Sequence, residues 1–238
     1  MNPERNLRTQ NSFMPLPRSA RALTKCYPEG MGFYDKYLLP RLVHFSCGQN
    51  PTTRQREKVV PLAEGNVLEI GIGTGLNIPF YDQDKVRHLW GLDPSAAMWS
   101  VAQKNAEEHH IDAEFVQSGA ESIPLDDNCA DTVVMTYTMC SIPGVPEALE
   151  EIRRVLKPGG RLIFCEHGKA PDKNVQRWQD RMNPLWKKIG GGCNLNRPIP
   201  QLLEQSGFKS ADLQTMYLPG WRPASFNYWG TAQDLSLI

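Results

Sequence analysis

Short apolar runs alternate with longer, helix-patterned segments from residue 60 onward. Strands are predicted at 66–71, 88–93, 113–117, 131–137 and 160–166, and helices at 77–82, 95–109 and 146–156. Strands that alternate with helices along a chain are typical of a parallel sheet with helices on both faces. The pattern therefore predicts an α/β fold for this part of the chain.

The pattern changes after residue 170. A helix is predicted at 174–189, where Pro184 should kink or restart it. Its apolar positions share one face and comprise Trp178, Met182, Leu185, Trp186 and Ile189. A short helix at 200–206 and two strands at 208–217 and 226–232 complete the chain, and we expect these strands to form an antiparallel pair at a sheet edge.

The sequence before residue 60 lacks strand patterns. Residues 26–60 are rich in aromatic and apolar side chains and are expected to be helical segments that cover a single domain spanning 26–238. Residues 1–25 carry five basic side chains against the single acid Glu4. We interpret them as a mobile arm, with peripheral contact to a membrane surface as the alternative.

Composition narrows the classes of function. The 238 residues include 26 basic and 26 acidic side chains, so the net charge predicts no nucleic-acid partner. No apolar run approaches the roughly 20 residues that span a bilayer. The six cysteines show no Cys-x-x-Cys spacing, which predicts buried thiols and no metal site. We expect a soluble, cytoplasmic protein.

A glycine-rich turn follows the first predicted strand. Gly71, Gly73 and Gly75 occupy alternate positions directly after the apolar segment 66–70. The next strand ends in Asp93, 18 residues beyond Gly75. A strand, a glycine turn and an acid about 20 residues later predict a site for a nucleoside, in which the acid accepts hydrogen bonds from ribose hydroxyls.

Two details favour S-adenosylmethionine over a nicotinamide dinucleotide. The dinucleotide motif needs its last glycine one position after Gly75, where this chain has Leu76. Glu69 stands at the end of the first strand, where a carboxylate repels a pyrophosphate and attracts an amine. A ligand with both a ribose and a cationic amino group fits these residues.

The sequence resembles the class I S-adenosylmethionine-dependent methyltransferases of the methyltransferase type 11 group. The matching blocks are 67–75, 91–98, 118–125, 131–142 and 154–166. The resemblance implies a Rossmann-like seven-stranded sheet of order 3-2-1-4-5-7-6, with strand 7 antiparallel.

The resemblance also implies roles for residues. The cofactor would be bound by Glu69, Gly71, Ile72, Gly73, Thr74, Gly75, Asn77, Asp93, Pro94, Ser95, Met98, Gly119, Ala120, Glu121, Thr136 and Tyr137. Among these, Ala120 would offer its backbone N–H to the adenine ring. Gly119 stands where relatives often have an acid for the adenine amine, so Glu121 or the backbone would take that contact.

The acceptor side resembles the alkyl thiol methyltransferases of the methyltransferase-like 7 group. The blocks 139–141, 166–168 and 192–197 carry this likeness. It implies S-methylation of a small-molecule thiol, with 170–200 as a lid over the acceptor site. N-methylation of phospholipid amines, C- or O-methylation of a quinone-like or natural-product acceptor, and a non-catalytic cofactor-binding module are the alternatives. The animal members of that group have an N-terminal membrane anchor, which we do not expect here.

Five residues are candidates for the acceptor site. His167 directly follows the fifth strand, and we predict that it accepts the proton of the thiol. Cys140, Trp186, Cys193 and Arg197 are expected to line the pocket. The cysteines could equally be small buried hydrophobes, and Arg197 could bind either an acidic substrate group or backbone carbonyls.

Overall fold

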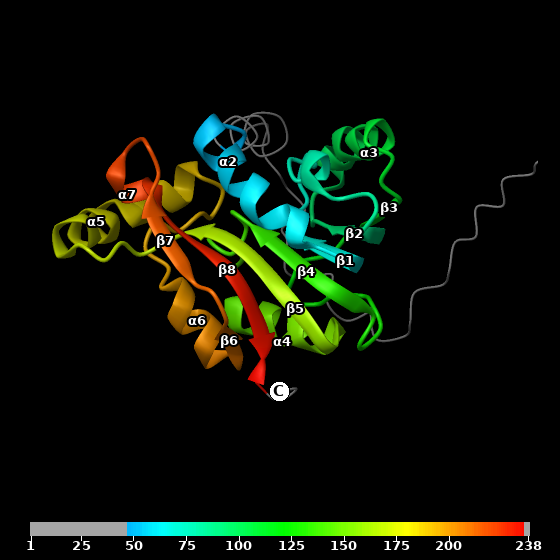
Figure 1. Ribbon diagram of the computed structural model, residues 1–238. Helices are drawn as coiled ribbons and strands as arrows, with labels where there is room; N and C mark the ends of the chain where they lie inside the picture. Colours follow the sequence, from blue (N-terminus) through cyan, green and yellow to red (C-terminus); the bar gives the residue numbers. More distant parts are fainter. Residues whose placement is uncertain (1–46, 236–238) are drawn as a thin grey trace, which may run out of the picture.

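The structure is a computed structural model that describes residues 47–235 (Figure 1). Its strands are β1 (Gly65–Ile70), β2 (Val86–Leu92), β3 (Ala113–Val116), β4 (Ala130–Thr136), β5 (Leu156–His167), β6 (Phe208–Ser210), β7 (Gln214–Tyr217) and β8 (Phe226–Asp234). Its α-helices are α2 (Asn50–Val59), α3 (Trp99–Glu108), α4 (Val145–Val155), α5 (Lys173–Ile189), α6 (Ile199–Gln205) and α7 (Arg222–Ser225). Three 3₁₀ helices are η3 (Val60–Leu62), η4 (Ile78–Phe80) and η5 (Ala96–Met98).

All eight strands form one mixed sheet of order β3-β2-β1-β4-β5-β8-β6, with β7 also paired to β8. β1 to β5 run parallel to one another, whereas β8 runs antiparallel to β5, β6 and β7. The predicted Rossmann-like order is confirmed, with β8 in the place of the seventh strand. β8 lies inside the sheet next to β5, and β6 and β7 form the edge.

The sixth predicted strand, 208–217, is broken into β6 and β7. Asp212 lies between them, and its Oδ1 accepts hydrogen bonds from the backbone N–H (2.7 Å) and the hydroxyl (2.9 Å) of Thr231 on β8. A Cβ on the neighbouring Gly230 would lie 2.8 Å from the Asp212 carbonyl oxygen. The Asp212 side chain therefore replaces backbone hydrogen bonds between the strands at this point. Pairing with β8 resumes in β7.

Two predicted helices and one strand differ in extent. The helix expected at 77–82 is only the turn η4, because Pro79 lies in it and Asn77 turns its side chain inward. The helix expected at 95–109 starts as η5 and becomes α3 at Trp99. β5 begins at Leu156, which pairs with Ala130 before the register shifts.

Apolar side chains fill the space on both faces of the sheet. On one face, Leu149, Ile152 and Val155 of α4 pack with Leu203 of α6 and with Phe164 of β5. The other face is covered by α2 and α3, whose Val59, Ala102 and Ala106 are buried. Figure 1 shows α4 and α6 below the sheet and α2 and α3 above it. Helices on both faces follow from this pattern.

The N-terminal predictions fall mostly outside the described residues. The arm at 1–25 and residues 26–46 of the helical cover lie there, and their assignments stay predictions. The part of the cover that is described, α2 and η3, is helical and packs on the sheet. Within residues 47–235, none of the helices combines the length and apolar character that crossing a bilayer requires.

α5 is attached to the domain by a polar side chain. Its apolar stripe does not pack inward, since Trp178 and Leu185 are each 60% exposed and Ile189 is 51% exposed. Gln179, which is completely buried, instead holds the helix. Its Nε2 lies 2.9 Å from the carbonyl oxygens of Gly168, Leu195 and Pro223, and its Oε1 accepts the Ala170 N–H. The helix continues through Pro184 as a single element.

We predict that Gln179→Met destabilises the protein by about 2–4 kcal/mol, because it leaves several buried backbone groups without partners. The measurement is urea unfolding followed by circular dichroism. Gln103→Met, at an exposed position of α3, is the matched control and should change the free energy of unfolding by less than about 0.5 kcal/mol. Equal effects of the two substitutions would show that Gln179 does not hold α5.

Candidate active site

A cavity opens at the carboxyl ends of β1, β2 and β4, the edge at which open α/β sheets bind ligands. Ten of the predicted cofactor residues line it, namely Glu69, Gly71, Ile72, Gly73, Thr74, Asn77, Asp93, Met98, Thr136 and Tyr137. Five further residues complete the lining: Cys47, Arg56, Leu76, Thr138 and Ser141. The turn after β1 and the acid after β2 thus face the same space.

The glycine turn is shaped by close backbone approach. Gly71 and Gly75 have φ values of +71° and +78°, in the left-handed region that favours glycine. A Cβ on Gly71 would lie 2.4 Å from the Thr138 side chain, and one on Gly75 would lie 3.0 Å from the Ala102 Cα of α3. A Cβ on Gly73 would touch only Met98, at 3.7 Å. Gly71 and Gly75 therefore permit close packing of the turn, whereas Gly73 leaves open space at the wall of the cavity.

Asp93 links the two loops. Its Oδ2 accepts the Gly73 N–H at 3.0 Å, and its Oδ1 accepts the Ser95 N–H at 2.8 Å. Burial raises the pKa of Asp93 from 3.8, against the effect of these two hydrogen bonds, which favour the ionised carboxylate. Each oxygen has a second lone pair, so the carboxylate can still accept hydroxyl donors from the cavity.

Glu69 is the centre of a buried polar network at the end of β1. Tyr81 donates its hydroxyl hydrogen to Oε2 at 2.8 Å, and Asn77 donates to Oε1 at 3.0 Å. Asn77 also donates to the Thr136 hydroxyl at 3.0 Å. Burial raises the pKa of Glu69 to about 7, while the hydrogen bonds from Tyr81 and Asn77 favour the ionised form. Asn77 therefore orients the carboxylate.

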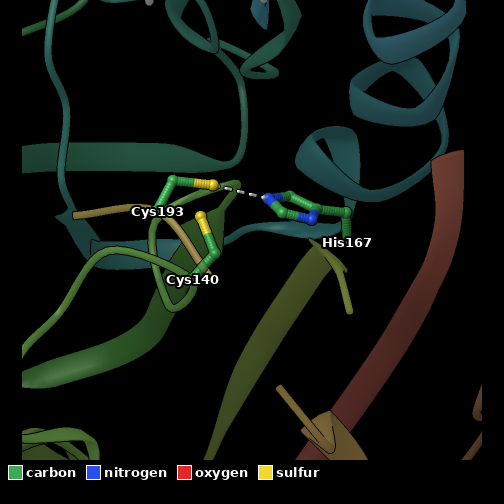
Figure 2. A group of neighbouring side chains, drawn as sticks. All are labelled: Cys140, His167 and Cys193. Carbon is green, nitrogen blue, oxygen red and sulfur yellow. Dashed lines mark hydrogen bonds between the residues drawn. The ribbon is translucent and has the colours of Figure 1, made fainter. Parts of the chain in front are cut away.

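Beyond this cavity, three residues from distant parts of the chain come together (Figure 2). Cys140 follows β4, His167 ends β5 and Cys193 lies in the loop after α5. The Cys193 sulfur lies 3.2 Å from His167 Nε2, and one ligand atom of each residue lies within 4.8 Å of the others. We call these three residues the Cys–His cluster. Ser141, whose hydroxyl lies 3.4 Å from the Cys140 sulfur, joins the cluster to the cavity lining.

The loop after α5 is bound to the loop after β4. The backbone N–H of Asn194 and its side-chain amide both donate to the Cys140 carbonyl, at 2.9 and 2.8 Å. Arg197 donates to the carbonyls of Met139 and Ile142, each at 2.6 Å. These bonds bring Cys193 next to Cys140. They also support the second interpretation of Arg197, in which it binds backbone carbonyls.

Glu166 fixes the loop after β4 from the other side. It is fully buried, and its Oε1 accepts the N–H groups of Thr138 and Met139 at 2.9 and 3.0 Å. Burial raises its pKa to about 7, although these N–H groups favour the ionised form. Its other oxygen, Oε2, and His167 Nδ1 are buried without a hydrogen-bond partner among the described residues.

Known proteins match this chain over most of its length. The human thiol S-methyltransferase TMT1B is 33% identical over 231 residues, 92% of this chain and 93% of the human protein. A demethylmenaquinone methyltransferase of Thermus thermophilus is 27% identical over 135 residues, 56% of this chain and 61% of that protein. A family model described as "Methyltransferase domain" matches residues 68–164. This chain belongs to the class I S-adenosylmethionine-dependent methyltransferases.

Solved structures give the same fold. The S-adenosylmethionine-dependent methyltransferase of Aquifex aeolicus superposes with a TM-score of 0.54 at 18% identity, over 81% of this chain and 96% of that one. The YcgJ protein of Bacillus subtilis superposes with a TM-score of 0.56 at 19% identity, over 79% and 95% of the two chains. The cofactor of this methyltransferase is S-adenosylmethionine, the methyl donor of its family.

Six of the residues expected at the cofactor do not line the cavity of this methyltransferase. Gly75 packs on α3, and Pro94 and Ser95 follow Asp93 in the turn before η5. Ala120, which follows Gly119 in the sequence, is buried in the hydrophobic core. Glu121 accepts the Gly144 N–H at 3.1 Å and so caps α4. Their assignments to the cofactor stay predictions.

Two important residues were missed by the sequence patterns. Arg56 of α2 enters the cavity, and its guanidinium lies 4.9 Å from the centre of the Tyr137 ring. Glu166 precedes His167 at the end of β5. A charged residue directly after the apolar run 162–165 was a signal for Glu166. Arg56 lies in a polar helical segment that shows no such contrast.

We predict that Glu69 lowers the stability of the ligand-free methyltransferase as pH rises. Its folded-state pKa of about 7 exceeds the ordinary value of 4.5. The contribution of Glu69 to the free energy of unfolding is therefore complete below about pH 4.5. It is lost as pH rises through about 7, and the loss is at most about 3 kcal/mol. Urea unfolding between about pH 5 and about pH 8 should give a shallower decline for Glu69→Gln than for the wild type.

The exposed variant Glu57→Gln is the control and should keep the wild-type slope. Some decline should persist in Glu69→Gln, because Glu166 titrates in the same range. An unchanged slope in Glu69→Gln would contradict the raised pKa of Glu69.

Proposed function

We propose that this methyltransferase methylates the sulfur of a small-molecule thiol. The observation that carries the proposal is the Cys–His cluster beside the cofactor cavity. The thiol S-methyltransferases match about nine-tenths of this chain, whereas the demethylmenaquinone methyltransferase matches about half of it. The long match supports a shared acceptor site as well as a shared cofactor site.

The cavity residues suit S-adenosylmethionine. Asp93 would accept hydrogen bonds from the ribose, and Gly73 leaves room for the ligand to lie on the backbone. The Glu69 carboxylate lines the cavity and would bind the amino group of the cofactor. When bound, the cofactor supplies a methyl group on a sulfonium ion, so the departing group needs no acid. The protein has to position the acceptor and help it to lose its proton.

A thiol needs such help because only a few per cent is ionised at neutral pH. His167 lies at the acceptor end, but its Nε2 is in contact with the Cys193 sulfur at 3.2 Å. A hydrogen bond with Cys140 and burial raise the pKa of Cys193 well above its usual value. Cys193 is therefore a neutral thiol at neutral pH, and it would have to move away before His167 could accept a substrate proton.

Residues 170–200 would cover the acceptor. α5 brings Trp186 to the cluster, and its indole N–H donates to the Cys193 sulfur at 3.4 Å. The Trp186 ring lies 5.7 Å from that of Trp221. These rings would contact the apolar part of a thiol that enters beside α5. We therefore propose α5 and the loop after it as the acceptor-site lid.

The acceptor class can be tested with S-adenosylmethionine labelled at the methyl group. Aliphatic and aromatic thiols, amines, phenols, quinols and vesicles that contain phosphatidylethanolamine would be offered separately. We expect label in the thioether product, with little transfer to the other classes. Transfer only to quinols or lipid amines would contradict the thiol proposal, and cofactor binding without any turnover would support a non-catalytic module.

The cofactor site can be tested separately with Asp93→Ala. Loss of hydrogen bonds to a charged group should weaken binding of S-adenosylhomocysteine by about 1.5–3 kcal/mol, or roughly 10- to 100-fold. Isothermal titration calorimetry gives the dissociation constants. Asp84→Ala, at an exposed position, should bind like the wild type. Unchanged affinity in a folded Asp93→Ala protein would show that Asp93 does not bind the ribose.

A further inference from the structure

The Cys–His cluster has the composition of a metal site. Two cysteine sulfurs and one imidazole nitrogen are ligands that zinc prefers, and three protein ligands with one open position are typical of catalytic zinc. The three residues come from the loop after β4, the end of β5 and the loop after α5, which is why the cysteine spacing in the sequence did not reveal them.

The distances suit a metal ion at the centre of the cluster. Zinc–sulfur and zinc–nitrogen bonds of about 2.3 and 2.0–2.1 Å place tetrahedral ligands about 3.5–3.8 Å apart. In the structure, Cys193 Sγ and His167 Nε2 are 3.2 Å apart, and all three ligand atoms lie within 4.8 Å of one another. Side-chain rotations that move each ligand atom by less than about 1 Å would complete the tetrahedral arrangement around a zinc ion.

The surroundings of the cluster favour bound thiolates. Trp186 directs an indole N–H at the Cys193 sulfur, and the Ser141 hydroxyl lies 3.4 Å from the Cys140 sulfur. Such outer donors orient metal ligands and stabilise their charge. His167 Nδ1 is buried and has no hydrogen-bond partner among residues 47–235. Asn194 and Arg197 hold the two cysteine loops together through backbone contacts, so the ligands are brought close before a metal binds.

We infer that Cys140, His167 and Cys193 bind a zinc ion whose fourth position takes the sulfur of the acceptor thiol. This inference rests on the proposed thiol acceptor, and it makes His167 a metal ligand in place of a proton acceptor. A shared zinc ion also explains the contact between His167 Nε2 and the Cys193 sulfur. This contact prevents His167 from accepting a substrate proton, but it places both atoms where one metal ion can bind them.

The chemistry balances with the known methyl donor. The acceptor thiol binds zinc as a thiolate and releases its proton to solvent, because a metal strongly lowers the pKa of a bound thiol. A sulfur lone pair then forms the new bond to the methyl carbon. The bond from that carbon to the sulfonium breaks, and its electron pair stays on the departing sulfur of S-adenosylhomocysteine. The neutral thioether is a weak ligand and leaves the zinc.

Metal content tests the site without an activity assay. The full chain, purified without chelator, should contain about one zinc ion by mass spectrometry of the metal. Cys140→Ser, Cys193→Ser and His167→Ala should each lower zinc affinity by about 100-fold or more, since loss of a ligand exceeds the effect of an outer-shell change. Cys129→Ser, which changes a cysteine outside the cluster, is the matched control and should keep the zinc.

Cobalt supplies a second measurement that needs no variant. Co²⁺ added to the metal-free wild type should produce a thiolate-to-cobalt charge-transfer band, and an aliphatic thiol should shift the visible bands by taking the fourth position. Absence of both zinc and the cobalt band would overturn the inference, as would a Cys140–Cys193 disulfide in the freshly purified protein. A cobalt spectrum that does not respond to thiols would overturn the acceptor role.

Activity then separates this inference from the proposed function. If chelator-treated, metal-free enzyme methylates thiols at the full rate, the zinc inference fails and the thiol proposal stands. If zinc binds but only amines or quinols are methylated, the thiol proposal fails and the role of the fourth position fails with it. Zinc-dependent thiol methylation that is lost in Cys193→Ser and kept in Cys129→Ser supports both.

Discussion

The buried Glu166 carboxylate accepts the backbone N–H groups of Thr138 and Met139, and through them it determines the path of the chain after β4. Tyr137, directly before these residues, has a φ of +54°, which is unusual for a side chain of this size. Such a conformation persists only where its surroundings hold it. The Tyr137 hydroxyl donates to Asn227 on β8 at 2.8 Å, so the antiparallel strand contributes to the same restraint. The cofactor cavity and the Cys–His cluster both depend on this loop.

The two halves of the active site are built in different ways. The cofactor half depends on local structure, since Gly71, Gly73 and Glu69 lie within five residues and Asp93 directly follows the adjacent strand β2. The acceptor half depends on contacts between distant segments. Asn194 and Arg197 bind carbonyls more than 50 residues earlier in the chain, and Gln179 holds α5 against backbone carbonyls of three other segments. Three of the five residues in the apolar stripe of α5 are exposed, and the buried Gln179 attaches the helix through hydrogen bonds.

This difference explains how much the sequence could predict. The alternation of strands and helices, the glycine turn and Asp93 follow from periodicity and short spacings, whereas the sheet order follows from the family resemblance. The structure places all of them as expected. The break at Asp212 could not be predicted, because it results from a side chain that bonds to a neighbouring strand. The pattern predicted that the apolar residues of α5 share one face, but the completely buried residue of this helix is Gln179, whose amide bonds to backbone groups of distant segments that a local pattern does not contain. The short distance between Cys140 and Cys193 likewise results from contacts between segments that are far apart in the sequence.

The separation of the two halves has a consequence for acceptor specificity. Changes in the loop after α5 would alter the acceptor site and leave Glu69, Asp93 and the glycine turn untouched, because the loop is bound to the backbone of residues 139–142 and not to the turn. The demethylmenaquinone methyltransferase matches about half of this chain, whereas the thiol S-methyltransferases match nearly all of it. A common cofactor domain with an exchangeable acceptor segment accounts for both matches. In this chain, that segment brings the Cys193 sulfur next to Cys140, which lies in the loop after β4.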